Sequence, residues 1–245
     1  MELKSYLRTF LIRVYAFLCF WKENRSKVIF YHDIHSQKKY TSTSTSIKLF
    51  RRHIDIIKES GYEIVDEITK NYGQIEICFD DGFLGLYENI EFLKNNNIPV
   101  HLFIVSSYLI REGYINQQQL IELNKLSLIK ISSHTHTHKL LNQITASEIE
   151  IELKKSKEII ESVIKSPVSG ICYPEGRFNK QTISIAQLLG YKKQYSCLPG
   201  FFSKSKDNII RRSLVQSAKE KEFRAILKGG DHILGLWYKF KYFKR

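Results

Sequence analysis

Hydrophobic and polar positions change period repeatedly along this chain. Ile75, Ile77 and Phe79 alternate with Glu76, Cys78 and Asp80, which is the two-residue period of a strand. Residues 47–60 instead carry apolar side chains at helical spacing, and residues 145–148 (TASE) have the form of a capping box that opens a long helix. Other short strands are expected at residues 27–31, 63–65, 100–105, 129–132 and 168–172, with weaker ones at 193–196 and 213–215.

Strands that alternate with helices in this way predict parallel β-α units. A chain of 245 residues is most simply one large domain, and this many units in one domain favour closure of the sheet. We therefore expect an α/β fold, a distorted (β/α) barrel with about seven parallel strands.

The two ends of the chain differ from this pattern. Residues 5–21 are apolar and aromatic, but Arg8 and Arg13 interrupt them, so the run is shorter than the roughly 20 residues of a spanning helix. No small-residue cleavage site follows, so no cleavable signal peptide is predicted. An amphipathic, membrane-associated helix and a helix packed on the core both fit the pattern. We expect an N-terminal segment at 1–26, the barrel at 27–228 and a basic, aromatic segment at 229–245.

Amino-acid composition limits the partners and the cellular compartment expected for the protein. The net charge of +13 favours anionic partners, and peripheral contact with an anionic membrane surface is one such interaction. Nucleic acid is not expected, because no nucleic-acid recognition motif is present. The four cysteines, at positions 19, 78, 172 and 197, form no C-x-x-C pair and are expected to be reduced. These features predict a cytoplasmic protein or one peripheral on the inner membrane.

Four polar clusters follow predicted strands directly, at the rim where β/α barrels assemble active sites. They are His32, Asp80-Asp81, residues 134–138 (HTHTH) and Tyr173-Pro174. The adjacent carboxylates Asp80 and Asp81 disfavour each other's ionised state, so they mark either a solvated turn or a site where a cation holds one acid. His134 and His138 have a spacing that suits zinc or a similar ion, although a solvated loop is the alternative.

Three motifs, in order and spacing, resemble those of polysaccharide deacetylases, the carbohydrate esterase family 4 or NodB-homology group. Residues 78–82 (CFDDG) resemble T-F-D-D-G, and residues 134–138 (HTHTH) resemble H-[ST]-x-[ST]-H. Residues 171–177 (ICYPEGR) resemble F-x-Y-P-x-G-R, and the likeness extends over residues 27–215. The resemblance implies a metal-dependent hydrolase that removes N-acetyl groups from a polysaccharide or a lipid-linked sugar and releases acetate.

The resemblance also implies roles for individual residues. Asp81, His134 and His138 would hold a divalent metal, zinc first and cobalt, nickel or manganese as alternatives. Asp80 would be the general base. Tyr173, through its backbone N–H, and Pro174 would lie at the substrate and oxyanion position.

Two departures from the family pattern concern the acid and the base. The third motif lacks the arginine that orients the base in many members, and Arg212 resembles a later family arginine that could orient it instead. The late histidine motif that supplies the general acid is missing. Tyr31-His32 resembles the Tyr-His of a branch in which the acid comes from the N-terminal side, so His32 is expected to be the acid, with a capping or core histidine as the alternative. The departures leave a second interpretation open, a catalytically weakened member that binds glycan or lipid.

Overall fold

The computed structural model describes residues 2–18, 24–203 and 209–235. Its main sheet contains parallel strands only, in the order β10-β9-β8-β7-β6-β5-β1-β11, with β4 also paired to β5. The strands are β1 (Lys27–Tyr31), β4 (Glu63–Val65), β5 (Gln74–Phe79), β6 (Val100–Ile104), β7 (Ile129–Ser133), β8 (Gly170–Cys172), β9 (Lys193–Tyr195), β10 (Ile209–Ile210) and β11 (Arg212–Leu214). A separate pair consists of β2 (Ile34–His35) and β3 (Thr45–Ser46).

The two ends of this strand order are neighbours in the chain. Only Arg211 separates β10 from β11, so a single bent segment pairs with β9 through its first half and with β1 through its second half. The chain itself thereby completes a ring. In the described part of the chain the ring has seven strands when β10 and β11 are taken as one, which confirms the expected fold.

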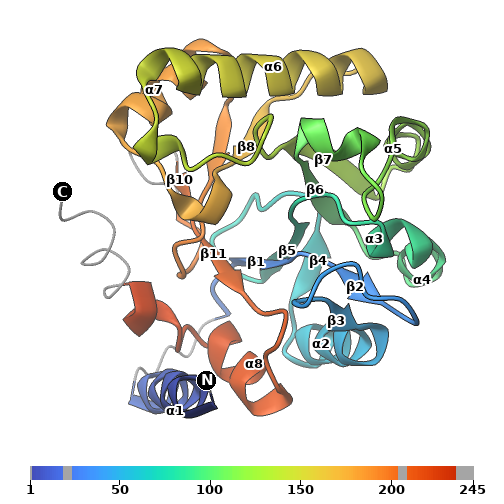
Figure 1. Cartoon of the computed structure of the whole chain (residues 1–245). Helices are drawn as coiled ribbons and strands as arrows, with labels where there is room; N and C mark the ends of the chain where they lie inside the picture. Colours follow the sequence, from blue (N-terminus) through green and yellow to red (C-terminus); the bar gives the residue numbers. More distant parts are fainter. Residues whose placement is uncertain (1, 19–23, 204–208, 236–245) are drawn as a thin grey trace.

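Helices surround the strands on the outside (Figure 1). They are α1 (Glu2–Leu18), α2 (Ile47–Glu59), α3 (Gly85–Glu88), α4 (Ile90–Asn95), α5 (Gln117–Asn124), α6 (Ala146–Ile164), α7 (Lys180–Leu188) and α8 (Glu220–Leu227), with 3-10 turns η1 (Ser106–Ile110), η2 (Leu141–Gln143) and η3 (Pro174–Gly176). The predicted capping box is present, because Thr145 pairs with Glu148 at the start of α6, and Ser46 caps α2. Helix α2 buries its apolar stripe, which contains Phe50, Ile54 and Ile57, in the hydrophobic core.

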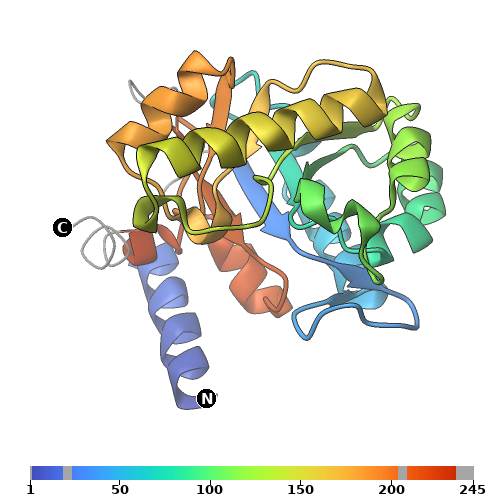
Figure 2. The same cartoon turned by 45° about the horizontal axis from the view of Figure 1, so that its top comes forward.

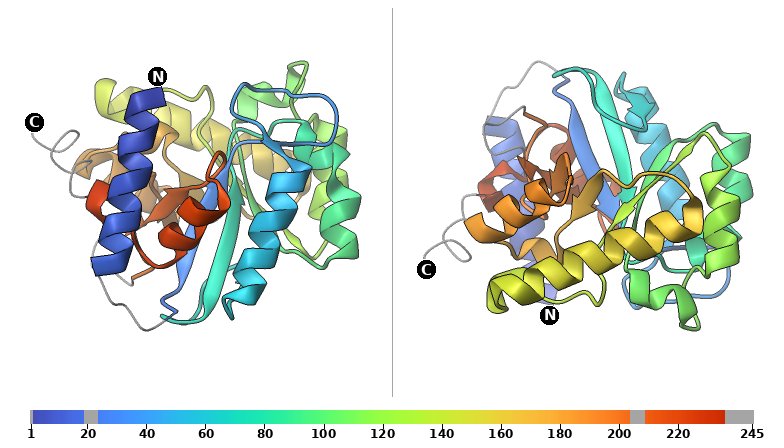
Figure 3. Two further views of the ribbon diagram at one scale, coloured as in Figure 1. Left: turned by 90° about the horizontal axis from the view of Figure 1, so that it is seen from below. Right: turned by 90° about the horizontal axis from the view of Figure 1, so that it is seen from above.

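Helix α1 lies outside the ring, alongside α8 (Figures 2 and 3). Its Ile12 is fully buried, and Thr9 donates a hydrogen bond of 3.1 Å to Glu222 of α8. The same helix exposes Phe10 and Phe17, which are 59% and 75% accessible. Helix α1 therefore has both a packed face and an exposed apolar face. Of the predicted C-terminal segment, residues 236–245 lie outside the described residues.

None of the helices described is long and apolar enough to cross a membrane.

Candidate active site

The turn after β5 gives the two adjacent aspartates different partners. Asp80 continues the strand ladder, because its N–H donates to the carbonyl of Tyr31 at 3.0 Å. Asp81 has a φ of 71°, a left-handed conformation that costs free energy in a residue with a Cβ. Both carboxylates are largely buried, and each faces its own set of charged or polar groups. Because each carboxylate has its own partners, the repulsion expected between two adjacent ionised aspartates is offset.

Asp81 meets two imidazoles. Its Oδ1 atom lies 3.4 Å from Nε2 of His134 and 3.3 Å from Nε2 of His138, and it accepts no hydrogen bond from a described group. Ligands on a tetrahedral zinc ion, with metal–ligand bonds of about 2.0–2.2 Å, are separated by roughly 3.3–3.5 Å. Both distances from Asp81 match this separation, and all three ligand atoms lie within 4.8 Å of one another, close enough to hold one divalent ion.

His134 is fixed in the tautomer that a metal ligand needs. Its Nδ1–H donates to the carbonyl of Cys172 at 2.8 Å, which leaves the lone pair on Nε2 toward Asp81. Burial lowers the pKa of His134 to about 4, so the ring is neutral at neutral pH. Burial also acts to lower the pKa of His138, but the Asp81 carboxylate beside it outweighs burial and the pKa is raised.

The HTHTH segment is an irregular loop, neither strand nor helix, with Thr135 and His138 at φ values of 68° and 64°. Glu152 of α6 holds the loop through three hydrogen bonds that it accepts. The donors are the N–H of His136 (3.1 Å), the N–H of Thr137 (2.8 Å) and the hydroxyl of Thr137. His136 bonds through Nδ1 to the hydroxyl of Ser106 at 2.8 Å and is not part of the cluster. The structure brings together the two histidines proposed from the sequence, His134 and His138, whereas Glu152 was not identified from the sequence.

Asp80 forms a bidentate ion pair with Arg212. Nη1 and Nη2 of Arg212 each donate to one carboxylate oxygen at 2.7 Å, and both side chains are buried. The guanidinium also donates through Nε to the carbonyl of Ser196 (3.0 Å) and lies over the ring of Phe30. Burial by itself raises the pKa of Asp80, but Arg212 outweighs it and holds this pKa well below its ordinary value. Asp80 is therefore ionised and held in a fixed orientation.

Two thiols lie against the same guanidinium. The sulfur of Cys172 is 2.7 Å from Nη2 of Arg212, and that of Cys197 is 3.8 Å from the same atom. Arg212, at the start of β11, supplies the cation that pairs with Asp80, and Cys172 lies beside it. Sequence reasoning gave no role to Cys197.

The expected role of Tyr173 needs correction. Its backbone N–H donates to the carbonyl of Tyr195 at 3.1 Å within the sheet, and its phenol donates to Gln194 at 2.7 Å. The N–H is therefore not available to an oxyanion. Pro174 begins η3 directly after it, and Glu175 follows with a φ of 51°. Among the described main-chain hydrogen bonds, none has the Glu175 N–H as its donor.

His32 lies close enough to both aspartates that its charge lowers the pKa of each. Its Nδ1–H donates to Oε1 of Gln216 at 2.7 Å, which fixes the ring and leaves Nε2 without a described hydrogen bond. Gln216 was not identified from the sequence, because a single amide after a short strand carries no signal of its own.

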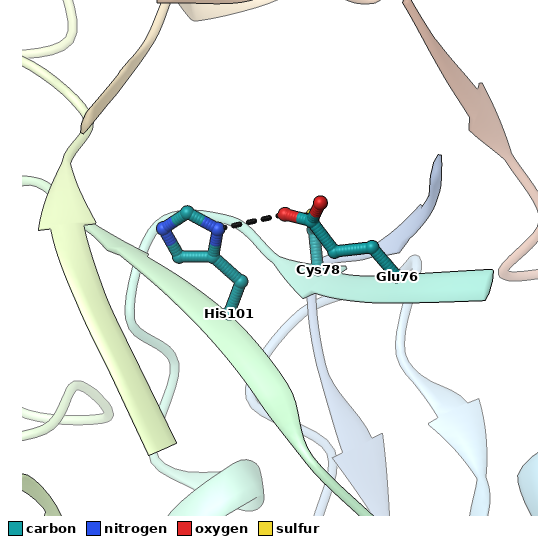
Figure 4. Close-up of side chains that lie close together, drawn as sticks. All are labelled: Glu76, Cys78 and His101. Carbon is teal, nitrogen blue, oxygen red and sulfur yellow. Dashed lines mark hydrogen bonds and ion pairs between the residues drawn. The ribbon is translucent and has the colours of Figure 1, made fainter. Parts of the chain in front are cut away.

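A second cluster inside the ring contains Glu76, Cys78 and His101 (Figure 4). His101 uses both ring nitrogens, Nδ1 with Glu76 at 2.8 Å and Nε2 with the hydroxyl of Ser132 at 2.7 Å. No nitrogen of this imidazole is left for an ion, and burial lowers its pKa. This cluster is a hydrogen-bonded network in the interior of the barrel.

A ring of parallel strands carries a carboxylate–imidazole cluster and an ion-paired aspartate at its carboxyl end, where β/α-barrel enzymes assemble their active sites. The sequence profile of the polysaccharide deacetylase family matches residues 67–193. The chain belongs to this family, and it is a carbohydrate deacetylase.

Individual relatives agree with this assignment. YxkH of Bacillus subtilis (strain 168), which bears the name of a polysaccharide deacetylase, is 25% identical over 194 residues, 75% of this chain and 68% of its own. IcaB from Ammonifex degensii has a similar structure, with a TM-score of 0.73 and 17% identity over 84% of this chain and 98% of its own. The deacetylase PplD of Streptococcus pyogenes, solved with acetate, has a TM-score of 0.70 and 19% identity over 86% of this chain and 97% of its own. At these identities the solved structures support the fold.

Proposed function

We propose that this deacetylase removes N-acetyl groups from a glycan with the help of one divalent ion, for which zinc is the best match. The observation that carries the proposal is the Asp81–His134–His138 cluster, in which Oδ1 of Asp81 lies 3.4 and 3.3 Å from the two imidazole nitrogens and accepts no hydrogen bond from a described group. One carboxylate oxygen and two imidazole nitrogens suit zinc, cobalt, nickel or manganese. An ion held there would polarise the amide carbonyl and acidify the attacking water.

Asp80 takes the proton of the attacking water in this proposal. It is the second carboxylate of the pair, it is ionised, and Arg212 fixes its orientation through two hydrogen bonds. A base held in this way needs no reorientation when the reaction begins.

His32 gives a proton to the departing amine. Gln216 holds its Nδ1–H, so Nε2 is the atom that would carry the transferred proton, and the ring lies near Asp80 and Asp81. Transfer to nitrogen is required because an amide does not release its amine as an anion. The products are a free sugar amine and acetic acid, one water having been consumed.

The main-chain donor for the tetrahedral oxyanion is assigned to Glu175 in place of Tyr173. The N–H of Glu175 makes no described main-chain hydrogen bond and lies one residue past Pro174, at the end of β8. Backbone N–H groups of this kind stabilise charge that develops on an acyl oxygen.

The substrate is proposed to be an N-acetylated polysaccharide or lipid-linked sugar that is met at an anionic membrane surface on the cytoplasmic side. The exposed apolar face of α1, with Phe10 and Phe17 beside Arg13, supports peripheral contact of this kind. The net charge of +13 favours the same surface.

Acetate release from a panel of N-acetylated glycans and lipid-linked sugars, with and without a chelator, tests the function. We expect release from at least one of them, its loss with chelator and its recovery with added zinc. Full activity of metal-stripped protein would refute the metal-dependent mechanism. Binding of a glycan without any acetate release would favour the weakened, glycan-binding interpretation.

A further inference from the structure

The two thiols beside Arg212 take no part in the proposed hydrolysis, yet they occupy the centre of the site. Cys172 ends β8 and is fully buried, whereas Cys197 follows β9 and is partly accessible. Both sulfurs contact the same nitrogen of Arg212, at 2.7 and 3.8 Å, so the two thiols lie close to each other beside this guanidinium. Strands β8 and β9 are paired, with Cys172 opposite Tyr195, two residues before Cys197.

We propose that Cys172 and Cys197 form a reversible disulfide that switches the deacetylase off. The oxidant is a small-molecule disulfide such as glutathione disulfide. The sulfur of Cys197, the more accessible thiol, attacks it and releases one glutathione thiolate, and the sulfur of Cys172 then attacks Cys197 and releases the second. The two cysteines lose two electrons and two protons, and one glutathione disulfide becomes two glutathione molecules.

Backbone carbonyls on either side of Cys197 connect the proposed disulfide to Arg212 and, through it, to Asp80. Ser196, next to Cys197, accepts the Nε–H of Arg212 at 3.0 Å, and Leu198 on its other side accepts the backbone N–H of Arg212 at 3.0 Å. Drawing the sulfur of Cys197 toward Cys172 therefore displaces the carbonyls that hold Arg212, and with them the ion pair to Asp80.

The same bond reaches the imidazole cluster and the η3 turn. The carbonyl of Cys172 accepts the Nδ1–H of His134 at 2.8 Å, so movement of Cys172 changes the orientation of that ring. A Cβ on Gly176 of η3 would lie 3.0 Å from the backbone nitrogen of Cys197, so this turn is packed directly on the second cysteine. A displacement on the order of 1 Å at groups of this kind lowers rates by roughly a hundredfold.

The experiment uses the full chain carrying Cys19→Ser, so that Cys78, Cys172 and Cys197 remain. After treatment with glutathione disulfide, we expect the intact mass to fall by two hydrogen atoms and peptide mapping to show Cys172 joined to Cys197. Cys78, buried beside Glu76, remains a free thiol and serves as the internal control. Free thiols at both positions, or a stable glutathione adduct on Cys197, would overturn the proposal.

The effect on catalysis is measured in the same samples and rests on the proposed function. We expect acetate release to fall at least tenfold on oxidation and to return with dithiothreitol, while Cys197→Ser protein loses no activity under the same treatment. A disulfide that forms without loss of activity would overturn the switch. Protein that is inactive even when reduced would contradict the proposed function, whereas the mass measurement would still decide whether the disulfide forms.

Discussion

Arg212 and Asp80 form a fully buried, bidentate ion pair across the carboxyl end of the barrel, with both hydrogen bonds at 2.7 Å. Asp80 follows β5 and Arg212 begins β11, and the two residues are 132 positions apart in sequence. The pair explains how one aspartate of an adjacent pair stays ionised in the protein interior while the other is available to the imidazoles.

Substitution of the two aspartates separates the base from the metal cluster. Asp80→Asn should lower the rate of acetate release by about 10²–10⁴-fold, because an amide cannot accept the proton, and should leave the zinc content unchanged. Asp81→Asn should lose zinc and activity together. Activity assays paired with elemental analysis of dialysed protein check both outcomes; zinc loss in Asp80→Asn would contradict the assignment.

Arg212→Met should shift the acid limb of the pH–rate profile upward. Without Arg212, burial that raises the pKa of Asp80 loses its main opposing charge, so the base becomes protonated at higher pH. Arg212→Lys is the matched control, because it keeps the charge but loses the bidentate fork. A profile for Arg212→Met that coincides with that of the native protein would show that Asp80 is not the base.

The Arg212→Met variant also tests how the free energy of unfolding depends on pH. Arg212 lowers the folded pKa of Asp80, so the pair contributes stability above the unfolded pKa, and this stability is lost as pH falls through the folded value. Arg212→Met leaves a buried carboxylate without its partner, which should destabilise the protein by about 3–5 kcal/mol at neutral pH. Urea unfolding at pH 7 and pH 4 should show a smaller difference between native and Met proteins at the lower pH, because burial raises the pKa of Asp80 in the Met protein and protonation there removes the unpaired charge.

The three histidines of the HTHTH loop should differ in their effect on metal binding. His134→Ala and His138→Ala should each abolish stoichiometric zinc, since both Nε2 atoms face Asp81. His136→Ala is the matched control and should keep zinc, because this ring bonds to Ser106 instead. Isothermal titration of metal-free protein with zinc gives the comparison, and equal losses in all three variants would point to collapse of the loop.

His32→Ala should discriminate between substrates by their leaving groups. Release of acetate from an N-acetyl sugar should fall by about 10²–10⁴-fold, because the amine requires a proton to depart. Hydrolysis of 4-nitrophenyl acetate should be nearly unchanged, since its phenolate leaves without one. Equal losses on both substrates would assign His32 a structural role, such as the cap or core residue that the sequence left open.

Binding of α1 to membranes should depend on its exposed aromatic residues. Replacing Phe10 and Phe17 together by Ser should weaken binding to phosphatidylglycerol vesicles at least tenfold, since a fully buried Phe contributes about 1.5–3 kcal/mol. Leu188→Ser, at an equally exposed apolar position on α7, is the control and should leave binding unchanged. Co-sedimentation measures both, and identical sedimentation of all proteins would exclude this helix as the contact.

Local patterns in the sequence were sufficient to predict most strands of the main sheet and the capping box at Thr145, but not the β2–β3 pair. Ring closure was harder to predict, because residues 209–214 are divided by Arg211 into two very short strands with different partners. The segment after Gly82 likewise forms two short helices, which are divided at Asn89, whose side chain donates to the carbonyl of Gly85.

The parts of the site that sequence reasoning missed depend on contacts between distant segments. In the sequence Glu152 is one of several acidic residues in a predicted helix, and only the packing of α6 brings it to the HTHTH loop. The engaged N–H of Tyr173 follows from the β8–β9 pairing, which no single motif contains. Tertiary hydrogen bonds of this kind leave no periodic signal in the chain.

Closure of the barrel by β10 and β11 brings Arg212 to Asp80. Asp81, His134 and His138 all precede Arg212 in the chain, so during synthesis the proposed metal ligands emerge before the counter-charge of Asp80. A truncated product that ends before residue 209 would keep every proposed metal ligand and lack the cation that pairs with Asp80.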